Sequence, residues 1–178
     1  MVAHPDDETI WMGGTILRYP EAVWTLFALC RNNDPDRCPK FLRAVKLYGA
    51  QGIISDLDDE GKLTLKESLA EIEKRILHKF KGRKFDYIFT HGSNGEYGHL
   101  RHKGAHLAVK RLFQKKKLQG RNLLFFAYFR PRAEFCLKLS KEELKTKKDI
   151  IKNIYGFSED SFENKNCARL ETFDKYHL

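Results

Sequence analysis

The stretch Val2-Ala3-His4-Pro5-Asp6-Asp7-Glu8 decides how the rest of the chain is interpreted. Pro5 has a fixed φ, and it keeps the preceding residue, His4, out of the α region. Such a corner suits a tight turn that leaves a strand and enters a helix. We therefore predict a strand that ends at residues 1–3 and a helix over residues 8–18. Either this first strand is very short or natural residues precede it, since strands usually have about five or six residues.

Three polar side chains of this corner indicate metal chemistry. His4 and Asp7 are three positions apart, so an imidazole and a carboxylate can turn toward one ion. Asp6 lies between them and points in another direction, and either Asp6 or Asp7 is placed to cap the helix. A catalytic zinc ion usually takes three protein ligands and a water molecule, so a third ligand must come from elsewhere. One region is rich in candidates, and its histidines are His91, His99, His102 and His106.

Length and composition indicate a single domain over residues 1–178. Hydrophobic residues make up 42% of the chain and charged residues 32%, which is typical of a soluble globular protein. No apolar run of about 18 residues is present, so we expect no transmembrane segment. The chain is polar from His4 onward, which argues against a signal peptide. The four cysteines form no C-x-x-C pair, and we expect reduced, mostly buried thiols in a cytoplasmic protein.

The net charge of the chain is +9. A solvated basic surface explains this charge, and the functional alternatives are an anionic substrate, a nucleic acid or an anionic membrane surface. The run Lys115-Lys116-Lys117 fits the polar end of a helix. No nucleic-acid partner is expected, because basic and aromatic residues do not interleave as they do in nucleic-acid-binding modules. A homo-oligomer is left open.

Hydrophobic periodicity predicts strands and helices in alternation. The predicted strands cover residues 21–30, 52–55, 85–90 and 122–129. The further predicted helices cover residues 39–48, 64–80, 99–118 and 140–153, and the tail beyond them is expected to be irregular. This alternation predicts an α/β fold, a single domain with a Rossmann-like, mostly parallel sheet flanked by helices. Sites in such sheets lie outside the carboxyl ends of strands, where the loops at 4–8 and 91–102 are both expected.

The second informative stretch runs from Thr90 to His106, where a glycine-rich turn precedes a group of histidines. His99 and His102 are spaced i, i+3, and His102 and His106 are spaced i, i+4, so on a helix they share a face. A lone histidine is more often structural, but four in so short a segment favour a site. We expect His91 and His106 to support or pack against this site rather than to act as ligands.

Two motifs together resemble a known family. A-H-P-D-D-E at Ala3–Glu8 and G-E-Y-G-H-x-x-H at Gly95–His102 are similar to motifs of the LmbE-like/PIG-L family of metal-dependent N-acetylglucosaminyl de-N-acetylases. The first motif is highly specific, and the resemblance covers roughly the whole chain, more weakly beyond Phe129. It implies a Rossmann-like sheet and the hydrolysis of an N-acetyl group from an amino sugar with zinc. Mixed nitrogen and oxygen ligands suit Zn²⁺, with Fe²⁺ as the alternative.

The resemblance also implies roles for particular residues. The metal ligands would be His4, Asp7 and His102. Asp6 would be the general base, His99 would stabilise the oxyanion or protonate the leaving amine, and Tyr97 would polarise the amide carbonyl. Arg37 matches an arginine of the family and would contact the substrate.

The chain departs from the family pattern at two places. Lys40 stands where the family often has a glutamate after the arginine, and Leu100-Arg101 replaces a Pro-Asp pair between the last two histidines. The missing carboxylate would normally tune the neighbouring histidine. The departure therefore bears on pH dependence and substrate preference, while hydrolysis itself stays compatible with the sequence.

The residue types suit this chemistry independently of the resemblance. A zinc ion with two imidazoles and one carboxylate keeps a net charge of about +1 and lowers the pKa of bound water to about 7. A carboxylate that is not a ligand, such as Asp6, can take a proton as the activated water attacks the amide carbon. Glu8 is explained by the preference of a helix N-terminus for negative charge.

Several other polar residues keep open alternatives. Asn33 and Asp34 follow a strand on the same side of the sheet and are predicted to bind sugar hydroxyl groups. The pair Asp58-Asp59 would either do the same or form a solvated acidic turn. Arg130 and Arg132 would hold a phosphate or form a surface pair.

We therefore expect a zinc-dependent hydrolase that removes the N-acetyl group from an amino sugar or glycoconjugate. The basic surface suggests an anionic substrate, such as a nucleotide-, phosphate- or lipid-linked sugar. Two alternatives stay open: a non-catalytic metal-dependent glycan- or nucleic-acid-binding domain, and a hydrolase of a different amide, such as a thiol conjugate. Asp6 favours an enzyme, because a binding module needs no free carboxylate beside the metal.

Overall fold

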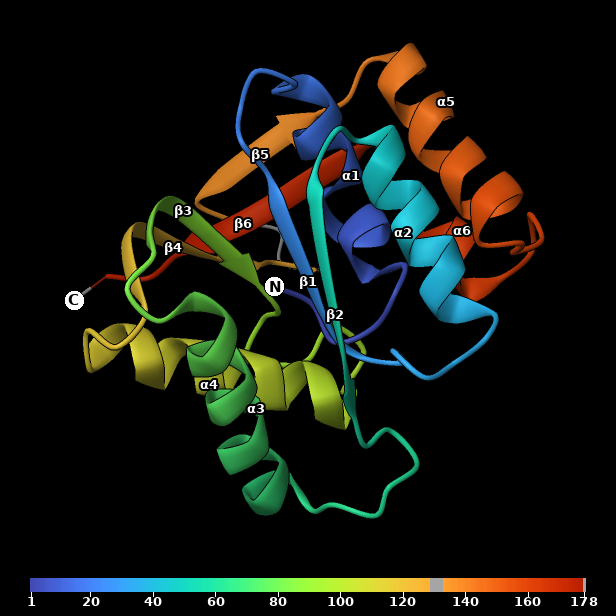
Figure 1. Ribbon diagram of the computed structural model, residues 1–178. Coiled ribbons are helices and arrows are strands. Elements are labelled where there is room, and N and C mark those ends of the chain that lie inside the picture. The colour runs from blue at the N-terminus through green and yellow to red at the C-terminus, as the bar shows by residue number, and fades with distance from the viewer. Residues whose placement is uncertain (129–132, 178) are drawn as a thin grey trace.

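Helices and strands alternate along the chain, and antiparallel strands follow in its C-terminal part (Figure 1). The computed structural model describes residues 1–128 and 133–177. Its helices are α1 (Asp7–Arg18), α2 (Arg37–Leu47), α3 (Leu65–Phe80), α4 (Leu100–Gln114), α5 (Lys141–Asp149), the π-helical turn η1 (Ile150–Ile154) and α6 (Phe162–Asn166). Its strands are β1 (Thr25–Cys30), β2 (Gln51–Leu57), β3 (Lys84–Thr90), β4 (Gln119–Phe126), β5 (Phe135–Lys138) and β6 (Leu170–Lys175).

Two parallel pairs of strands, β1 with β2 and β3 with β4, flank the first residues of the chain. The Val2 N–H donates to Phe27 O on β1 at 2.8 Å, and the Met1 amino group donates to Phe89 O on β3 at 2.7 Å. Residues 1–3 therefore lie between β1 and β3. From there the chain passes through α1 to β1 on one side, and later through α3 to β3 on the other. This change of direction is a topological switch point, the place where α/β sheets bind ligands.

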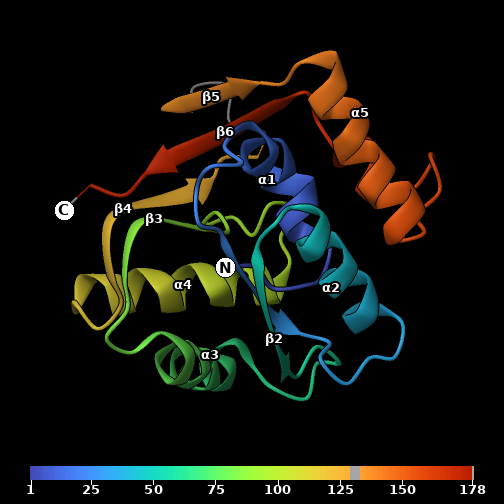
Figure 2. The same cartoon turned by 45° about the horizontal axis from the view of Figure 1, so that its top comes forward.

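Helices cover both faces of the parallel strands. Leu26 and Ala28 of β1 belong to a core cluster with α1, α2 and η1, whereas Phe27 and Leu29 belong to a second cluster with α3 and α4. Figure 2 shows α3 and α4 together on one side and α1, α2 and α5 on the other. Strands covered on both faces have continuous hydrophobic sequences, which is why β1 is buried at every position after Thr25.

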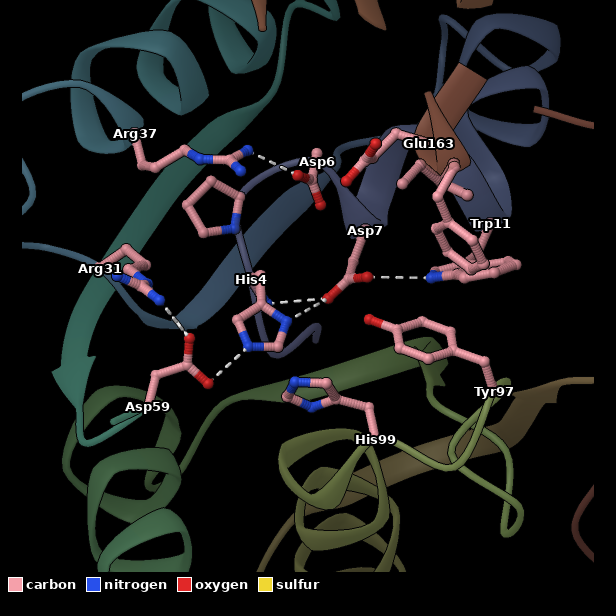
Figure 3. Close-up of a pocket in the computed structure, with 13 residues that line it drawn as sticks. His4, Asp6, Asp7, Trp11, Arg31, Arg37, Asp59, Tyr97, His99 and Glu163 are labelled. Carbon is pink, nitrogen blue, oxygen red and sulfur yellow. Dashed lines mark hydrogen bonds and ion pairs between the residues drawn. The ribbon is translucent and has the colours of Figure 1, made fainter. Parts of the chain in front are cut away.

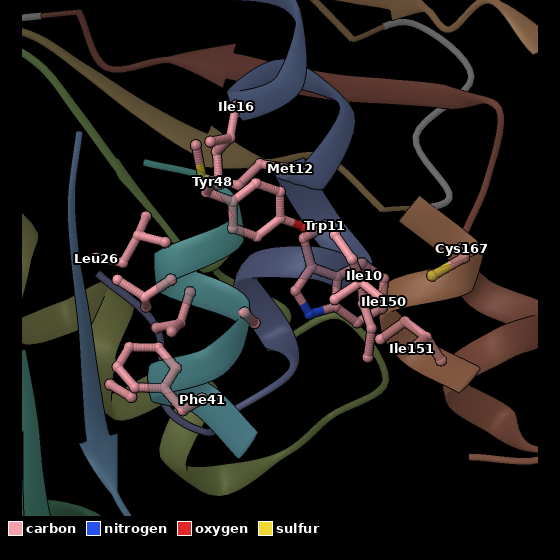
Figure 4. Packing of buried hydrophobic residues seen from close by; sticks show 14 of the residues in the cluster. Ile10, Trp11, Met12, Ile16, Leu26, Phe41, Tyr48, Ile150, Ile151 and Cys167 are labelled. Atoms are coloured by element: carbon pink, nitrogen blue, oxygen red, sulfur yellow. The ribbon is translucent and has the colours of Figure 1, made fainter. Parts of the chain in front are cut away.

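Helix α1, which carries part of the first motif, is fixed from behind by a buried ion pair. The Lys147 ammonium on α5 lies 2.7 Å from Glu171 Oε1 on β6. Glu171 also accepts the N–H groups of Gly14 and the next residue at 2.8 and 2.7 Å. A Cβ at Gly14 would overlap the Leu139 side chain, so only glycine permits this approach. Ile10 of α1 packs in the same core as η1 (Figure 4), so the C-terminal elements hold α1 in place.

The α/β fold with helix-flanked sheets is confirmed, and the elements from α1 to β4 lie near their predicted positions. The strand predicted to end at residues 1–3 is only an isolated parallel bridge between Val2 and Ala28. The expectation of an irregular tail beyond residue 153 is wrong, because α6 and β6 lie there and β6 pairs antiparallel with β4 and β5. The described strands form a two-stranded parallel sheet, β1–β2, and a four-stranded mixed sheet in the order β3–β4–β6–β5. The last residue of the strand predicted over 122–129 lies outside the described residues, as do Arg130 and Arg132.

Two further expectations concern helix ends and cysteines. The helix predicted over residues 99–118 ends at Gln114, because a turn follows in which Lys116 has φ 53°. All cysteines are free thiols, of which Cys30 and Cys167 are buried. Among the helices of the described residues, none has the length and apolar character needed to cross a membrane.

Candidate metal centre and active site

The turn of the first motif has an uncommon backbone conformation. Asp6 has φ 106°, which costs a non-glycine residue on the order of 1–3 kcal/mol. The Asp6 N–H donates to the buried Glu8 carboxylate at 3.1 Å, and Tyr155 O–H donates to Glu8 at 2.7 Å. Glu8 therefore supports the turn as well as the helix end. Asp6 occupies the N-cap position but its side chain makes no capping bond, so the capping prediction is wrong for Asp6. Its carboxylate faces the pocket instead (Figure 3).

The two motifs bring three atoms of ligand type together. His4 Nδ1 lies 3.2 Å from Asp7 Oδ2, and His102 Nε2 lies 3.3 Å from each of these two atoms. A tetrahedral zinc site with ligands at about 2.0–2.1 Å has its ligand atoms about 3.3 Å apart. The three residues that the resemblance implied as ligands thus have the spacing that such an ion needs.

Hydrogen bonds on the far side of each ring leave lone pairs on the shared side. His4 Nε2 lies 3.0 Å from Asp59 Oδ1, and His102 Nδ1 lies 2.6 Å from Glu96 Oε2. An ionised carboxylate only accepts hydrogen bonds, so both of these nitrogen atoms carry a proton. In the neutral rings that a metal ion requires, the other two nitrogen atoms would direct lone pairs at the space beside Asp7 Oδ2. A proton takes this position on the His4 ring when no cation is bound. Burial lowers the pKa of His4, but the bonds to Asp59 and Asp7 outweigh it and raise the pKa to about 9.

Other ligand-type side chains lie nearby but are occupied. Within the described residues, three groups have their ligand atoms within 4.8 Å of one another: His4, His99 and His102; His4, Cys30 and Asp59; and Asp7, His91 and His102. His91 has no free nitrogen, because Nε2 accepts the Ala3 N–H at 2.9 Å and Nδ1 donates to Glu96 at 2.7 Å. Burial raises the pKa of the Cys30 thiol, which keeps it neutral. His106 donates from Nδ1 to the His91 carbonyl at 3.0 Å, a supporting position.

Partners fix the orientation of the first motif's two candidate ligands. Asp59, on the loop after β2, binds His4, and the Arg31 guanidinium donates to Asp59 at 2.7 and 3.1 Å. The Trp11 indole N–H donates to Asp7 Oδ1 at 3.0 Å, one helical turn along α1. Groups in these positions orient metal ligands, and their loss typically costs about 10–100-fold in metal affinity.

Glu96 orients His102 of the second motif in the same way, and it also binds His91, whose Nε2 accepts the Ala3 N–H. Its carboxylate accepts hydrogen bonds from His102 Nδ1 at 2.6 Å, from His91 Nδ1 at 2.7 Å and from the Gly92 N–H at 2.7 Å. The His91 ring stacks on the His102 ring with centroids 3.9 Å apart. Burial would raise the pKa of Glu96, but the two histidines lower it to about 2 and keep the carboxylate ionised.

Asp6 is a pocket-lining carboxylate of the first motif that does not belong to the three-atom group. Its Oδ2 lies 2.7 Å from Arg37 Nη1, and the Arg37 guanidinium lies 4.7 Å from the centre of the Phe157 ring. Burial and the neighbouring Asp7 raise the pKa of Asp6 well above its ordinary value, although Arg37 opposes them. Such a carboxylate accepts a proton readily, as a general base must. Arg37, expected to contact substrate, positions Asp6 in this structure.

His99 and Tyr97 reach the same space from the loop before α4 (Figure 3). His99 is the N-cap residue of α4, and its Nδ1 accepts the Arg101 N–H at 3.2 Å. The proton of the neutral ring therefore lies on Nε2. Burial lowers the pKa of His99 to about 4, with help from His4 and His102. Burial also raises the pKa of the Tyr97 hydroxyl, which keeps it a proton donor.

These side chains line an open pocket of about 250 Å³. Residues of both motifs line it, and Figure 3 shows Arg31 and Asp59 together at one side. Glu163 of α6 lies on the opposite side (Figure 3), and Phe162, the residue before it, also lines the pocket. A C-terminal helix therefore completes a site that the N-terminal motif begins. His102 is fully buried and is not a lining residue of the pocket, but its Nε2 lies beside His4 and Asp7, which do line it.

Asn33 and Asp34 lie outside this pocket, in a neighbouring hollow of about 460 Å³. The Asn33 amide donates to Asp56 Oδ2 at 2.7 Å. Asp34 Oδ1 accepts the Arg37 N–H at 2.9 Å and so helps to start α2. Both side chains are engaged by the chain itself, and their contact with a sugar stays a prediction.

The two departures from the family pattern have structural roles. Arg101 is buried, and its Nη2 donates to Asp58 Oδ2 at 2.6 Å and to Leu63 O at 3.1 Å. This contact links α4 to the loop that carries Asp58 and Asp59, so that loop is not a freely solvated turn. Lys40 forms an exposed ion pair with Asp36 at 2.7 Å.

Sequence reasoning did not identify Trp11, Glu96, Phe162 or Glu163 as site residues. Trp11 lies four positions after Asp7, a helical spacing that indicates side-chain contact. Glu96 lies within the second motif, but the motif does not show which polar residues bond to one another. No pattern in the sequence places α6 beside the N-terminal corner.

Comparison of the structure finds similar solved proteins, whereas comparison of the sequence does not. No family model matches the sequence, and no curated protein matches it. GalB, the 4-carboxy-2-hydroxymuconate hydratase from Pseudomonas putida KT2440, is 14% identical with a TM-score of 0.69, over 99% of this chain and 95% of that chain. Dbv21, the A40926 pseudoaglycone deacetylase, is 14% identical with a TM-score of 0.65, over 97% and 93% of the two chains. A deacetylase triple mutant from the teicoplanin biosynthetic pathway is 12% identical with a TM-score of 0.67, over 94% and 86%.

At these identities the likeness shows the fold alone. Membership of the LmbE-like/PIG-L family remains a resemblance in sequence. The three solved structures also cover two reaction classes, deacetylation and hydration. One fold can host several activities, so the activity of this chain must be argued from its site.

Proposed function

We propose that this protein is a zinc-dependent hydrolase that removes the acetyl group from an N-acetylated amino sugar or glycoconjugate. One observation supports it most: the ligand atoms of His4, Asp7 and His102 lie 3.2–3.3 Å apart, beside a separate carboxylate, Asp6. A site that only binds metal or glycan has no need of that carboxylate. The proposal treats residues 1–178 as one LmbE-like/PIG-L deacetylase domain, with Zn²⁺ preferred and Fe²⁺ as the alternative.

The chain's own residues would divide the chemistry among them. A bound zinc ion would lower the pKa of a water molecule and polarise the acyl oxygen. Arg37 holds Asp6 in place, and Asp6 accepts a proton from the water as the water oxygen attacks the amide carbon. Tyr97 O–H and His99 Nε2–H donate hydrogen bonds to the developing oxyanion. The C–N bond then breaks as Asp6 passes its proton to the amide nitrogen, which leaves as the amine.

This assignment gives His99 the first of its two expected roles. Its Nδ1 already accepts the Arg101 N–H, and burial lowers the pKa of the ring to about 4. A neutral ring has a hydrogen-bond donor to offer but no spare proton to transfer. Asp6 is therefore the group that carries the proton from water to amine.

Hydration is the second candidate, because GalB has the same fold. GalB is a 4-carboxy-2-hydroxymuconate hydratase, and the name of that compound describes a molecule that carries carboxylates. In this pocket the two arginines, Arg31 and Arg37, are already paired with Asp59 and Asp6 at 2.7 Å. Since no arginine among the described residues that line the pocket is unpaired, the site favours an uncharged amide over a carboxylate-rich substrate.

A substrate panel tests the proposal. Zinc-loaded protein is incubated with N-acetylglucosamine, its nucleotide-linked and lipid-linked forms, and an N-acetylated thiol conjugate, and acetate and free amine are both measured. We expect equal amounts of acetate and amine from at least one sugar, with loss on chelation and recovery on zinc addition. Release from the thiol conjugate alone would replace the sugar by a different amide. Sugar binding without any acetate would favour the binding domain.

A further inference from the structure

One side of the pocket carries a charge that nothing in the described chain neutralises. Glu163 is partly buried and lines the pocket, and it makes no hydrogen bond or ion pair with another described residue. The other carboxylates of the pocket, Asp6, Asp7 and Asp59, are each bound by an arginine or a histidine. Figure 3 shows Glu163 on the side of Asp6, directed into the same space. A group left without a partner in a pocket is available to a ligand.

The residue before it gives this side of the pocket an apolar surface. Phe162 is 44% exposed, and its ring lies edge-on to Tyr97 with centroids 4.7 Å apart. Its position is fixed, because the Ser161 side chain accepts the Asn164 N–H at 3.1 Å at the start of α6. An ordered, partly exposed aromatic ring beside a polar site offers a face on which the C–H side of a sugar ring can pack.

The charge of this region opposes the charge of the molecule as a whole. The chain carries a net +9, yet both pocket arginines are already neutralised by carboxylates. A bound dication would lie beside Asp7, and Asp6 and Asp59 are paired with the two arginines, so Glu163 would remain the pocket carboxylate with no cation beside it among the described residues. A phosphate or carboxylate next to the scissile amide would be repelled, whereas hydroxyl groups would find an acceptor.

We propose that Phe162 and Glu163 form the substrate-selecting wall of the site, and that this wall selects a neutral, polyhydroxylated N-acyl amine with no anionic group next to the acylated nitrogen. Phe162 packs on the apolar face of the sugar, and Glu163 accepts hydrogen bonds from its hydroxyl groups. The inference rests on the proposed deacetylation. It reverses the expectation, drawn from the net charge, that the substrate is anionic.

Two substrates that differ by one phosphate test the inference. kcat/KM for acetate release is measured with N-acetylglucosamine and with N-acetylglucosamine 1-phosphate, whose phosphate is next to the acetamido carbon. Zinc-loaded wild type should prefer the neutral sugar. In Glu163→Gln the ratio should shift toward the phosphate by about three- to tenfold, as expected for one partly screened charge. An unchanged ratio, or wild-type preference for the phosphate, would overturn the proposal.

Asp160→Asn is the matched control. It removes the same charge three positions earlier, from a fully exposed side chain that lies 3.9 Å from Lys165 and does not line the pocket. Its substrate ratio should stay within about twofold of wild type. An equal shift in both variants would mean that long-range charge, and not the wall, sets the preference.

A binding measurement tests the role of Phe162 and Glu163 separately from the proposed deacetylation. If wild type releases no acetate, the same two sugars are titrated into the zinc-loaded proteins by calorimetry. Preference of wild type for the neutral sugar, reduced by the same factor in Glu163→Gln, would support the wall although deacetylation had failed. Binding of neither sugar, or an unchanged ratio of dissociation constants, would overturn the wall as well.

Discussion

The two sides of the pocket hold their functional groups in different ways. On the metal side, Asp59, Trp11 and Glu96 each bind the atom of a candidate ligand that faces away from the shared space. On the α6 side, Glu163 has no partner among the described residues, and Phe162 keeps 44% of its surface exposed. Metal ligands must be held within a few tenths of an ångström, so their partners are built in. Groups that recognise a sugar gain their partners only when the sugar binds.

The largest effect is expected when the metal side loses a ligand. A catalytic zinc site needs three protein ligands, so His102→Ala should lose both bound zinc and turnover. The control is His106→Ala, since that histidine donates to the His91 carbonyl at 3.0 Å and contacts none of the three candidate ligand atoms among the described residues, so zinc should stay in place. Elemental analysis of both purified variants gives the answer. Full zinc occupancy in His102→Ala would remove it from the ligand set.

A smaller loss should follow when the proton carrier is removed and the ligands are kept. Asp6→Asn preserves shape and can still bond to Arg37 through its amide oxygen, but it cannot take a proton at pH 7. We expect kcat to fall by roughly 10²–10⁴-fold, with zinc content and thermal stability little changed. KM should move far less, because the lost interaction belongs to the transition state. Turnover near the wild-type rate would exclude Asp6 as the base.

The third prediction compares a glutamate from each side of the pocket. Glu96→Gln weakens the bonds that orient His102, so zinc affinity should fall by about 10–100-fold. Glu163→Gln makes the same chemical change on the α6 side and should leave zinc affinity unchanged. Competition with a chromogenic chelator measures both. Equal losses in the two variants would show that the pocket does not divide into a metal side and a substrate side.

The metal side and the α6 side of the pocket also differ in how well the sequence predicts them. The first motif and His102 lie in short, distinctive segments, and strands buried on both faces, such as β1, have unmistakable apolar sequences. Helix α6 has only five residues, and β6 has the mixed sequence LETFDK with no regular apolar alternation, so neither has a strong local signal. Their positions are set by tertiary contacts, such as the pairing of Phe173 with Phe126 of β4.

Glu96 and the pair Asn33 and Asp34 show the same limit within the site. Glu96 has φ 57°, and this conformation turns its carboxylate toward two histidines, five positions before it and six after it. Neither the conformation nor the contact can be read from spacing. Asn33 and Asp34 follow β1 at the expected edge, but the bond of Asn33 to Asp56 and the helix-starting role of Asp34 engage them elsewhere. A motif locates a site, whereas the partners of each polar atom depend on the folded backbone.

The smallest effect should come from the apolar half of the α6 side. Phe162→Ala removes a ring face that packs on the sugar, an area of about 40 Å² worth about 1 kcal/mol, or roughly fivefold in affinity. This contact is made equally before and in the transition state, so KM should rise about fivefold while kcat and zinc affinity stay near wild type. Phe162→Tyr should restore KM, because it keeps the ring. The control is Phe135→Ala, which removes a ring of similar exposure, 45%, from the edge strand β5 outside the site pocket. A fall in kcat or zinc content in Phe162→Ala would show instead that α6 supports the metal side, and the contrast between the two sides would then fail.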